Sequence, residues 1–243
     1  MKHYSIDQYA INSSFYALDP RAKIVSLLFF VLVIALIHEL KALIIAFFSV
    51  FIMIAISRVP ILHITKRYII ALPFIFFAFL SIYFYSGIYN AILIFLRISV
   101  CVLTLILLST TTPFFDLLNA LQKLKIPKLF IVMLMFTYRY FFVFVDELER
   151  MKIARKARCF SFGKSFFDKY SMKIISFTCG MVLVRAYDRG TRIYDALKSR
   201  GYDGNIKTIK NFCFKHYDYV FIAIIFFVSF FIISISLGVV IWE

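Results

Sequence analysis

The amino-acid sequence predicts an all-α polytopic membrane protein with about five transmembrane helices and a long helical region on the cytoplasmic side. Three observations favour this fold class. The 243 residues are 63% hydrophobic and only 17% charged, whereas a soluble domain carries about 25% charged residues. Apolar runs recur along the chain at lengths close to that of a membrane span. Of the net charge of +15, a net +12 lies between residues 113 and 216, where 20 Lys and Arg residues accompany only 8 Asp and Glu residues.

The apolar runs predict the spans, and the basic residues between them predict the topology. Basic side chains cluster before the first run and between the second and third runs, whereas the loop at 85–90 has none. Lys and Arg flank spans on the cytoplasmic side. We therefore expect the N-terminus in the cytoplasm and the C-terminus outside, in the cell (inner) membrane. The predicted spans are residues 24–37, 42–57, 68–86, 91–110 and 219–241.

The basic segment after the fourth run predicts three cytoplasmic helices. Thr112 and Pro113 are typical of an N-cap and a first helical residue, and Pro127 is expected to end the first helix. A second helix, 128–158, has an apolar first half and a charged second half. A third helix, about 165–200, is amphipathic. The predicted organisation is an N-terminal transmembrane bundle at 1–112, a cytoplasmic helical region at 113–216 and a C-terminal span at 217–243.

One charged side chain, Arg97, lies inside the fourth predicted span. An arginine in a span is costly and usually faces protein or water rather than lipid. We expect it to donate to a backbone carbonyl group of a neighbouring helix. The alternative is a contact to a partner or to a transport path.

The sequence contains no complete motif for catalysis, metal binding or nucleotide binding. Gly163-Lys164-Ser165 looks like the end of a P-loop, but Arg158 stands where that motif needs its first glycine. The four histidines are scattered without an i,i+4 pair; His3 alone has a nearby carboxylate, that of Asp7, and a solvated N-terminus is the better interpretation of it. We therefore expect a non-catalytic chain with no cofactor, no metal site of its own and no nucleic-acid partner.

Two other function classes remain open on these residues. A membrane-embedded lipid-modifying enzyme would need paired carboxylates near the membrane face. The main acidic cluster consists of Asp146, Glu147 and Glu149, and nearby Arg150 and Lys152 make it look structural. A conventional permease would form the substrate path itself, but the spans hold few polar groups to line one. The proteins that co-purify with the chain would separate these classes.

The remaining signal is a tripeptide that recurs at the ends of two predicted helices. Each copy holds a small residue, then an arginine, then a residue where the helix stops. The helix dipole favours an arginine at a C-terminus, and the guanidinium presents a planar fork of N–H donors. Such a tip suits a partner groove lined by carboxylates, although an ordinary dipole-matched helix end would have the same residues. The two copies are Ala157-Arg158-Cys159 and Ser199-Arg200-Gly201.

A series of stretches along the chain carries a resemblance to a known family: Leu18–Lys23, Thr111–Leu118, Leu124–Pro127, Tyr138–Tyr140, Asp146–Arg150, Ala154–Arg158 and Arg192–Gly204. In this order they resemble the transmembrane T component of an energy-coupling factor (ECF) transporter. The resemblance implies that the two tripeptides are the Ala-Arg-Gly motifs at the ends of that family's coupling helices. Cys159 then replaces glycine in the first motif, and Ser199 replaces alanine in the second.

This resemblance implies an importer in which the chain bridges two cytosolic ABC-type ATPases to a separate membrane substrate-binding subunit. ATP-driven closure of the ATPases would move the coupling helices, and these would tilt or release the substrate-binding subunit. The stretches 5–10 and 184–192 look closest to the cobalt and nickel uptake subgroup. The alternative is the same component serving vitamin uptake. Arg158 and Arg200 are then expected to couple the ATPases to transport.

Overall fold

The computed structural model describes residues 13–124, 126–158, 169–202 and 216–242, together with Gly204 and Phe214. The chain divides into two compact units. The first unit combines Met1–Lys125 with Ile209–Glu243, and the second unit is Ile126–Thr208.

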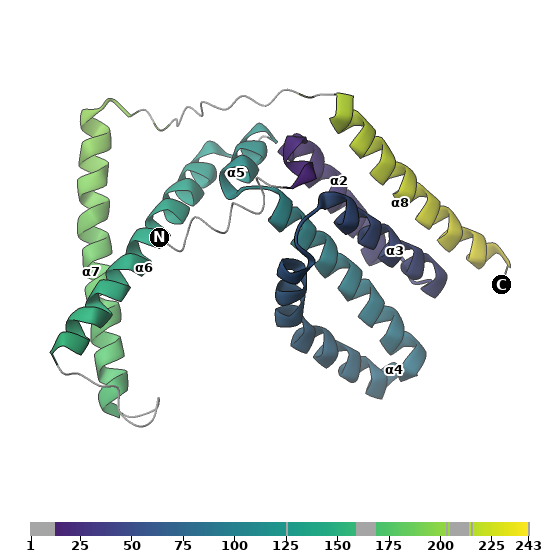
Figure 1. The fold of residues 1–243 in the computed structure, drawn as a ribbon, viewed down its shortest axis with the longest axis horizontal. Helices are drawn as coiled ribbons and strands as arrows, with labels where there is room; N and C mark the ends of the chain where they lie inside the picture. The colour runs from purple at the N-terminus through teal and green to yellow at the C-terminus, as the bar shows by residue number, and fades with distance from the viewer. Residues whose placement is uncertain are drawn as a thin grey trace. The chain divides into compact units, whose positions relative to one another are not determined.

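The described residues confirm the predicted all-α fold, because the regular elements among them are helices and none is a strand (Figure 1). The first unit contains the 3-10 helix η1 (Ser14–Ala17) and the α-helices α2 (Pro20–Leu36), α3 (Leu40–Ser57), α4 (Ile61–Thr111), α5 (Phe114–Lys123) and α8 (His216–Trp242). The second unit contains α6 (Lys128–Ala157) and α7 (Lys169–Ser199).

The ends of α2 and α3 follow from local sequence. The Asp19 Oδ1 accepts a hydrogen bond from the Arg21 N–H at 2.9 Å, and Pro20 occupies the first turn of α2, where its missing N–H is not needed. Helix α3 ends at Arg58, whose φ of 54° lies in the left-handed region, which non-glycine residues seldom adopt. The chain therefore reverses sharply between α3 and α4.

Helix α4 contains both the third and the fourth predicted spans. Its 51 residues are interrupted at Gly87, where φ is 84° and ψ is 175°. That combination is open almost only to glycine. The interruption falls inside the loop predicted at 85–90, and the apolar segments on either side are each long enough to cross a bilayer.

Four helices of the described chain are long and apolar enough to span a membrane, judged by length and composition: α3, α4, α6 and α8. Helix α2 has 17 residues and coincides with the first predicted span. Helix α6 belongs to this set although the sequence predicted a helix that does not cross. Its first half is apolar up to Val145, with Arg139 as the single charge after Lys128. The number of crossings therefore stays a prediction.

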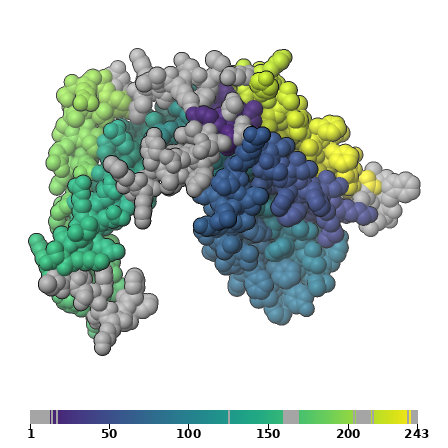
Figure 2. Space-filling view, viewed as in Figure 1, coloured from purple at the N-terminus to yellow at the C-terminus, as the bar shows by residue number. Residues whose placement is uncertain are grey.

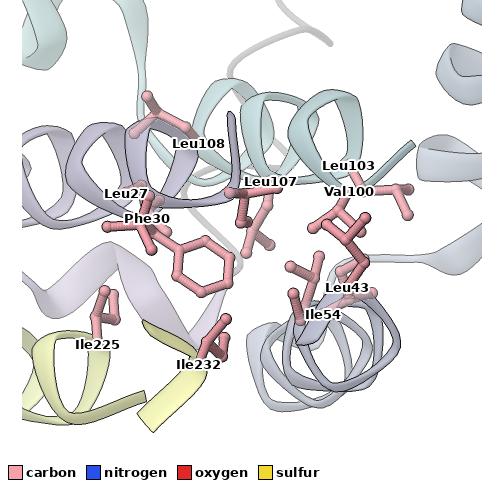
Figure 3. Packing of buried hydrophobic residues seen from close by; sticks show 14 of the residues in the cluster. Leu27, Phe30, Leu43, Ile54, Val100, Leu103, Leu107, Leu108, Ile225 and Ile232 are labelled. Carbon is pink, nitrogen blue, oxygen red and sulfur yellow. The ribbon is translucent and has the colours of Figure 1, made fainter. Parts of the chain in front are cut away.

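The core of the first unit lies where α2, α3, α4 and α8 meet (Figure 3). Phe30 of α2 points toward α8 near Ile232, and Leu43 of α3 lies close to Val100 of α4. Each of these four side chains is at most 1% exposed. Lipid tails are as apolar as these side chains, so close packing rather than exclusion of water holds helices together in a membrane.

The arginine inside the fourth predicted span is bonded as expected. Arg97 Nη2 donates to the carbonyl oxygen of Ile37, which is the C-cap of α2. Carbonyl groups at a helix C-terminus have no partner within their own helix. The prediction of a structural bond to a neighbouring helix is confirmed.

The outer surface of the first unit is strongly apolar. Figure 2 shows the first half of α4, in blue, on that surface. Its large side chains include Phe74, which is 79% exposed, and Phe77, which is 74% exposed. Soluble monomers rarely expose large contiguous apolar patches, so this surface fits contact with lipid.

In the second unit, α6 and α7 form an antiparallel pair. Arg185 of α7 donates to Glu147 Oε1 of α6, and Arg155 Nη1 of α6 donates to Thr178 Oγ1 of α7. Residue numbers that rise along α6 thus pair with numbers that fall along α7, and Figure 1 shows α7 crossing the C-terminal half of α6. Both bonds involve the charged half of α6.

Of the three predicted starts of cytoplasmic helices, one differs from the structure by one residue, one agrees with it, and one cannot be compared. Pro113, expected as a first helical residue, is the N-cap of α5, which begins at Phe114; Thr112 precedes it in extended conformation. The difference is one residue, which is the usual uncertainty of helix ends. Helix α6 begins at Lys128, as predicted. The expected start of the third helix near Ser165 lies outside the described residues.

Candidate functional site

Both predicted coupling arginines occupy the C-cap of a helix. Arg158 is the C-cap of α6, and its N–H donates to the carbonyl oxygen of Arg155 at 3.1 Å. Arg200 follows Ser199, the last residue of α7, and its N–H donates to the carbonyl oxygen of Leu197 at 3.1 Å. The two arginines are therefore equivalent in backbone position.

The end of α7 is a Schellman motif centred on Gly201. The Tyr202 N–H donates to Leu197 O at 3.1 Å, and the Gly201 N–H donates to Lys198 O at 3.1 Å, which is the paired bonding that defines the motif. Gly201 has a φ of +68°, which is the left-handed conformation that this position of the motif needs and that glycine adopts without a Cβ clash. This motif ends the helix at Ser199 and leaves Arg200 at the tip.

The described site residues lie on the surface. Ala157 and Arg158 are exposed at the end of α6, and Ser199, Arg200 and Gly201 are exposed at the end of α7. Cys159, the third residue of the first tripeptide, lies outside the described residues. The structure thus presents both arginine side chains to solvent, where a partner surface can reach them.

Each helix end is positively charged. The last turn of α6 carries Arg155 and Lys156 before Arg158, and the last turn of α7 carries Lys198 before Arg200. Cations at a C-terminus are stabilised by the partial negative charge of the helix dipole. A guanidinium fork also matches a carboxylate in two parallel hydrogen bonds. Both tips are therefore suited to bind acidic groups or unpaired carbonyl oxygens.

The antiparallel arrangement separates the two tips. Arg158 lies close in sequence to Arg155, which bonds Thr178 on α7. From Thr178 to Arg200, α7 rises by roughly 33 Å at the α-helical rise per residue. The tips therefore lie at opposite ends of the helix pair, too far apart to enter one groove together.

Sequence reasoning missed the bonds that hold α6 against α7. It interpreted Glu147 as part of an acidic cluster neutralised along its own helix, whereas Glu147 pairs with Arg185 on the neighbouring helix. It assigned Arg155 no role beyond the basic helix end. These pairs follow from the alignment of α6 beside α7, and the sequence alone does not determine how two helices align.

The remaining candidate chemistry is sparse in the part of the chain that the structure describes. Within those residues, no three His, Cys, Asp or Glu side chains lie close enough to hold a metal ion. A groove of about 720 Å³ in the first unit is lined by apolar side chains such as Phe30, Met53 and Phe221. Its lining contains no carboxylate and no histidine, so it suits hydrocarbon rather than an ion.

Comparison with known protein families gives a match over most of the chain. The family model described as "CbiQ: Cobalt transport protein" matches residues 12–210. That range contains both tripeptides and helices α2 to α7.

Three curated relatives are similar over parts of their length. An uncharacterized protein of Methanocaldococcus jannaschii, MJ1089, is 34% identical over 57% of this chain, and the match spans 51% of the relative. A second protein of that organism, MJ1571, is 30% identical over 79% of this chain and 72% of its own length. The cobalt transport protein CbiQ of Rhodobacter capsulatus is 29% identical over 42% of this chain and 40% of its own. The chain thus spans about half of the first of these relatives.

Proposed function

This chain belongs to the CbiQ family of cobalt transport proteins, and from that premise we propose that it is the transmembrane energy-coupling subunit of an ECF-type ABC importer. The family and the long apolar helices make it a multi-pass membrane protein. In the proposed complex, two cytosolic ABC-type ATPases bind its cytoplasmic region, residues 113–216. A separate membrane subunit binds the substrate.

The pair of matched helix ends is the observation that carries this proposal. Arg158 and Arg200 share the C-cap position, and both are exposed. A transporter subunit that serves two ATPases needs two contact points, one for each. The tips lie at opposite ends of the α6–α7 pair, so each can enter the groove of a different ATPase.

Motion follows from this arrangement. When the ATPases close on ATP, the two grooves approach one another and displace the tips that they hold. Helices α6 and α7 are bonded together through Glu147 and Arg185, so they respond by changing their crossing rather than by bending separately. That change tilts or releases the substrate-binding subunit.

We propose cobalt or nickel ions as the substrate. The description of the family and the name of the Rhodobacter relative support this choice. The N-terminus lies in the cytoplasm of the cell (inner) membrane in this proposal, because the basic residues flank the spans on that side. If the complex takes up a vitamin instead, the substrate assignment is wrong and the proposed coupling role is unchanged.

Purification of the tagged chain from its native membrane tests the proposal. We expect two ATPase copies and a further membrane subunit to co-purify, and ATP hydrolysis to appear only in the complex. Saturable hydrolysis by the isolated chain would contradict its non-catalytic role. A chain that purifies alone and modifies lipid would place it among membrane-embedded enzymes instead.

A further inference from the structure

A lysine is fully buried in the first unit. Lys23 of α2 is 2% exposed, although lysine is almost never fully buried unless it is paired. Removing an ammonium group from water is costly unless acceptors replace the lost hydration. The position of its acceptors therefore shows what the side chain holds in place.

One acceptor comes from the end of α4. Lys23 Nζ donates to the carbonyl oxygen of Thr111 at 3.3 Å, and Thr111 is the last residue of α4. Carbonyl groups at a helix C-terminus lack partners within their helix and carry partial negative charge. Lys23 thus caps α4 from another helix, 88 positions earlier in the chain.

Buried carboxyl groups lie at the starts of three helices of the same unit. Asp116 lies in the first turn of α5 and is 8% exposed, and α5 packs against α2. Asp19 precedes α2 by one residue, and its N–H donates to Asp218 Oδ1 of α8 at 2.7 Å. Arg21 Nε lies 3.9 Å from Asp19 Oδ1, so Arg21 and Lys23 both place positive charge in the first turn of α2.

The joint between α4 and α5 needs such a constraint. Only Thr112 and Pro113 separate the two helices, and both are extended, with ψ of 117° and 147°. Two extended residues form a pivot about which α5 could swing. The chain continues from α5 to α6, the first helix of the second unit.

We infer that Lys23 is a positioning residue that locks the α4–α5 joint, so that force on α6 reaches the membrane helices instead of being absorbed at Thr112 and Pro113. This inference rests on the proposed coupling function. Without Lys23, α5 is held only by its packing against α2; the ATPases still bind and close, and their motion moves the substrate-binding subunit less.

The test uses the whole complex in proteoliposomes. Lys23→Met keeps the length of the side chain and removes its charge, and Lys23→Arg keeps a cation. Lys41→Met removes an exposed lysine from the start of α3 and serves as the control. The readouts are membrane insertion, ATPase pull-down, ATP hydrolysis and cobalt-ion uptake, and the deciding quantity is uptake per ATP hydrolysed.

We expect Lys23→Met to lower uptake per ATP by about tenfold, the scale of a strong coupling mutation, while ATPase binding and hydrolysis persist. Lys23→Arg should recover part of the loss, and Lys41→Met should match the wild type. If Lys23→Met reduces only the amount of inserted protein and leaves uptake per ATP unchanged, Lys23 is a purely structural residue and the inference is wrong.

A second variant decides the case if Lys23→Met does not insert. Lys23→Gln is shorter and uncharged but keeps a polar side chain at this buried position, and it should lower uptake per ATP in the same way because the bond to Thr111 O is lost. A wild-type ratio in Lys23→Gln would overturn the inference. Failure of the wild-type chain to bind ATPases would instead remove the proposed function, which keeps the two failures distinguishable.

Discussion

Arg158 and Arg200 share one backbone position at the ends of α6 and α7, and the proposed contact with the ATPases depends on that position. A C-cap residue is only half part of the helix, and both arginines are exposed there. The dipole stabilises its charge in the free protein. The subunit therefore presents these two cations in defined places, ready for the proposed contact with the ATPases.

Replacing either arginine by alanine should disrupt coupling while the subunit still inserts in the membrane. A buried, charge-assisted interface contact that loses one partner costs about 2–5 kcal/mol. Pull-down of the ATPases, their hydrolysis rate in the complex and substrate uptake should all fall for Arg158→Ala and Arg200→Ala.

Arg189→Ala is the matched control, because it removes the same charge from the middle of α7. Arg200→Lys should rescue only partly, since an ammonium group cannot form the bidentate contact. Arg200→Glu should be worse than Arg200→Ala, because it opposes both the dipole and an acidic groove. If both alanine variants behave like Arg189→Ala in all three measurements, the arginines are only helix caps.

Replacement by alanine should have opposite effects on stability at Gly201 and at Gly190, a glycine in the middle of α7. An added Cβ at Gly201 meets no atom within 4 Å, but its φ is +68°. Gly201→Ala should therefore lower the free energy of unfolding by about 1 kcal/mol through backbone strain alone.

Gly190 lies inside α7 and also has no atom within 4 Å of an added Cβ. Gly190→Ala should raise the free energy of unfolding by about 1 kcal/mol. Denaturant unfolding of the solubilised subunit checks the two signs; a shift of the same sign in both variants would contradict the assignment of the Schellman motif.

Polar bonds join the two long helices of the second unit. In contrast to the first unit, α6 and α7 bury only Ile131 and Ser171 among their described residues. The Glu147–Arg185 ion pair and the Arg155–Thr178 hydrogen bond tie the helices together across the charged half of α6. In the proposed function, α6 and α7 change their crossing angle when the ATPases close.

A charge exchange tests the interhelical pair. The Glu147 side chain is 18% exposed and that of Arg185 is 50% exposed, so solvent screens the pair and its worth is about 0.2–1 kcal/mol. Glu147→Arg and Arg185→Glu should each lower the free energy of unfolding, and the double exchange should recover most of the loss. A double-mutant cycle measures the coupling energy. A coupling energy of zero would show that packing, and not this pair, orients α7 on α6.

The assembled transporter is where the substrate assignment can be checked. Cells that carry the full complex should accumulate labelled Co²⁺ or Ni²⁺, and deletion of this chain should abolish that uptake. Uptake should also fall in the Arg158→Ala and Arg200→Ala variants, because they act on the same step. Accumulation of a vitamin without accumulation of metal would reject cobalt and nickel while retaining the coupling function.

Composition and local patterns alone determined the fold class of this protein and some of its helix ends, such as the start of α6 at Lys128. A chain that is 63% hydrophobic cannot cover itself with a soluble surface, and Pro127 and Gly201 mark boundaries through backbone chemistry that acts within one turn. The two arginine tips were predictable for the same reason, because a helix end is a local property.

Only the tertiary structure decided which distant groups meet. Arg97 bonds Ile37 across 60 positions, Glu147 bonds Arg185 across 38, and Lys23 bonds Thr111 across 88. Each pair depends on the rotation and register with which two helices pack, which arises from many small contacts rather than from the residues of the pair. The sequence could predict that Arg97 needs an acceptor, because an unpaired charge in a span is costly. It gave no comparable signal that Lys23 is buried, because a lysine at the edge of a span is ordinarily solvated.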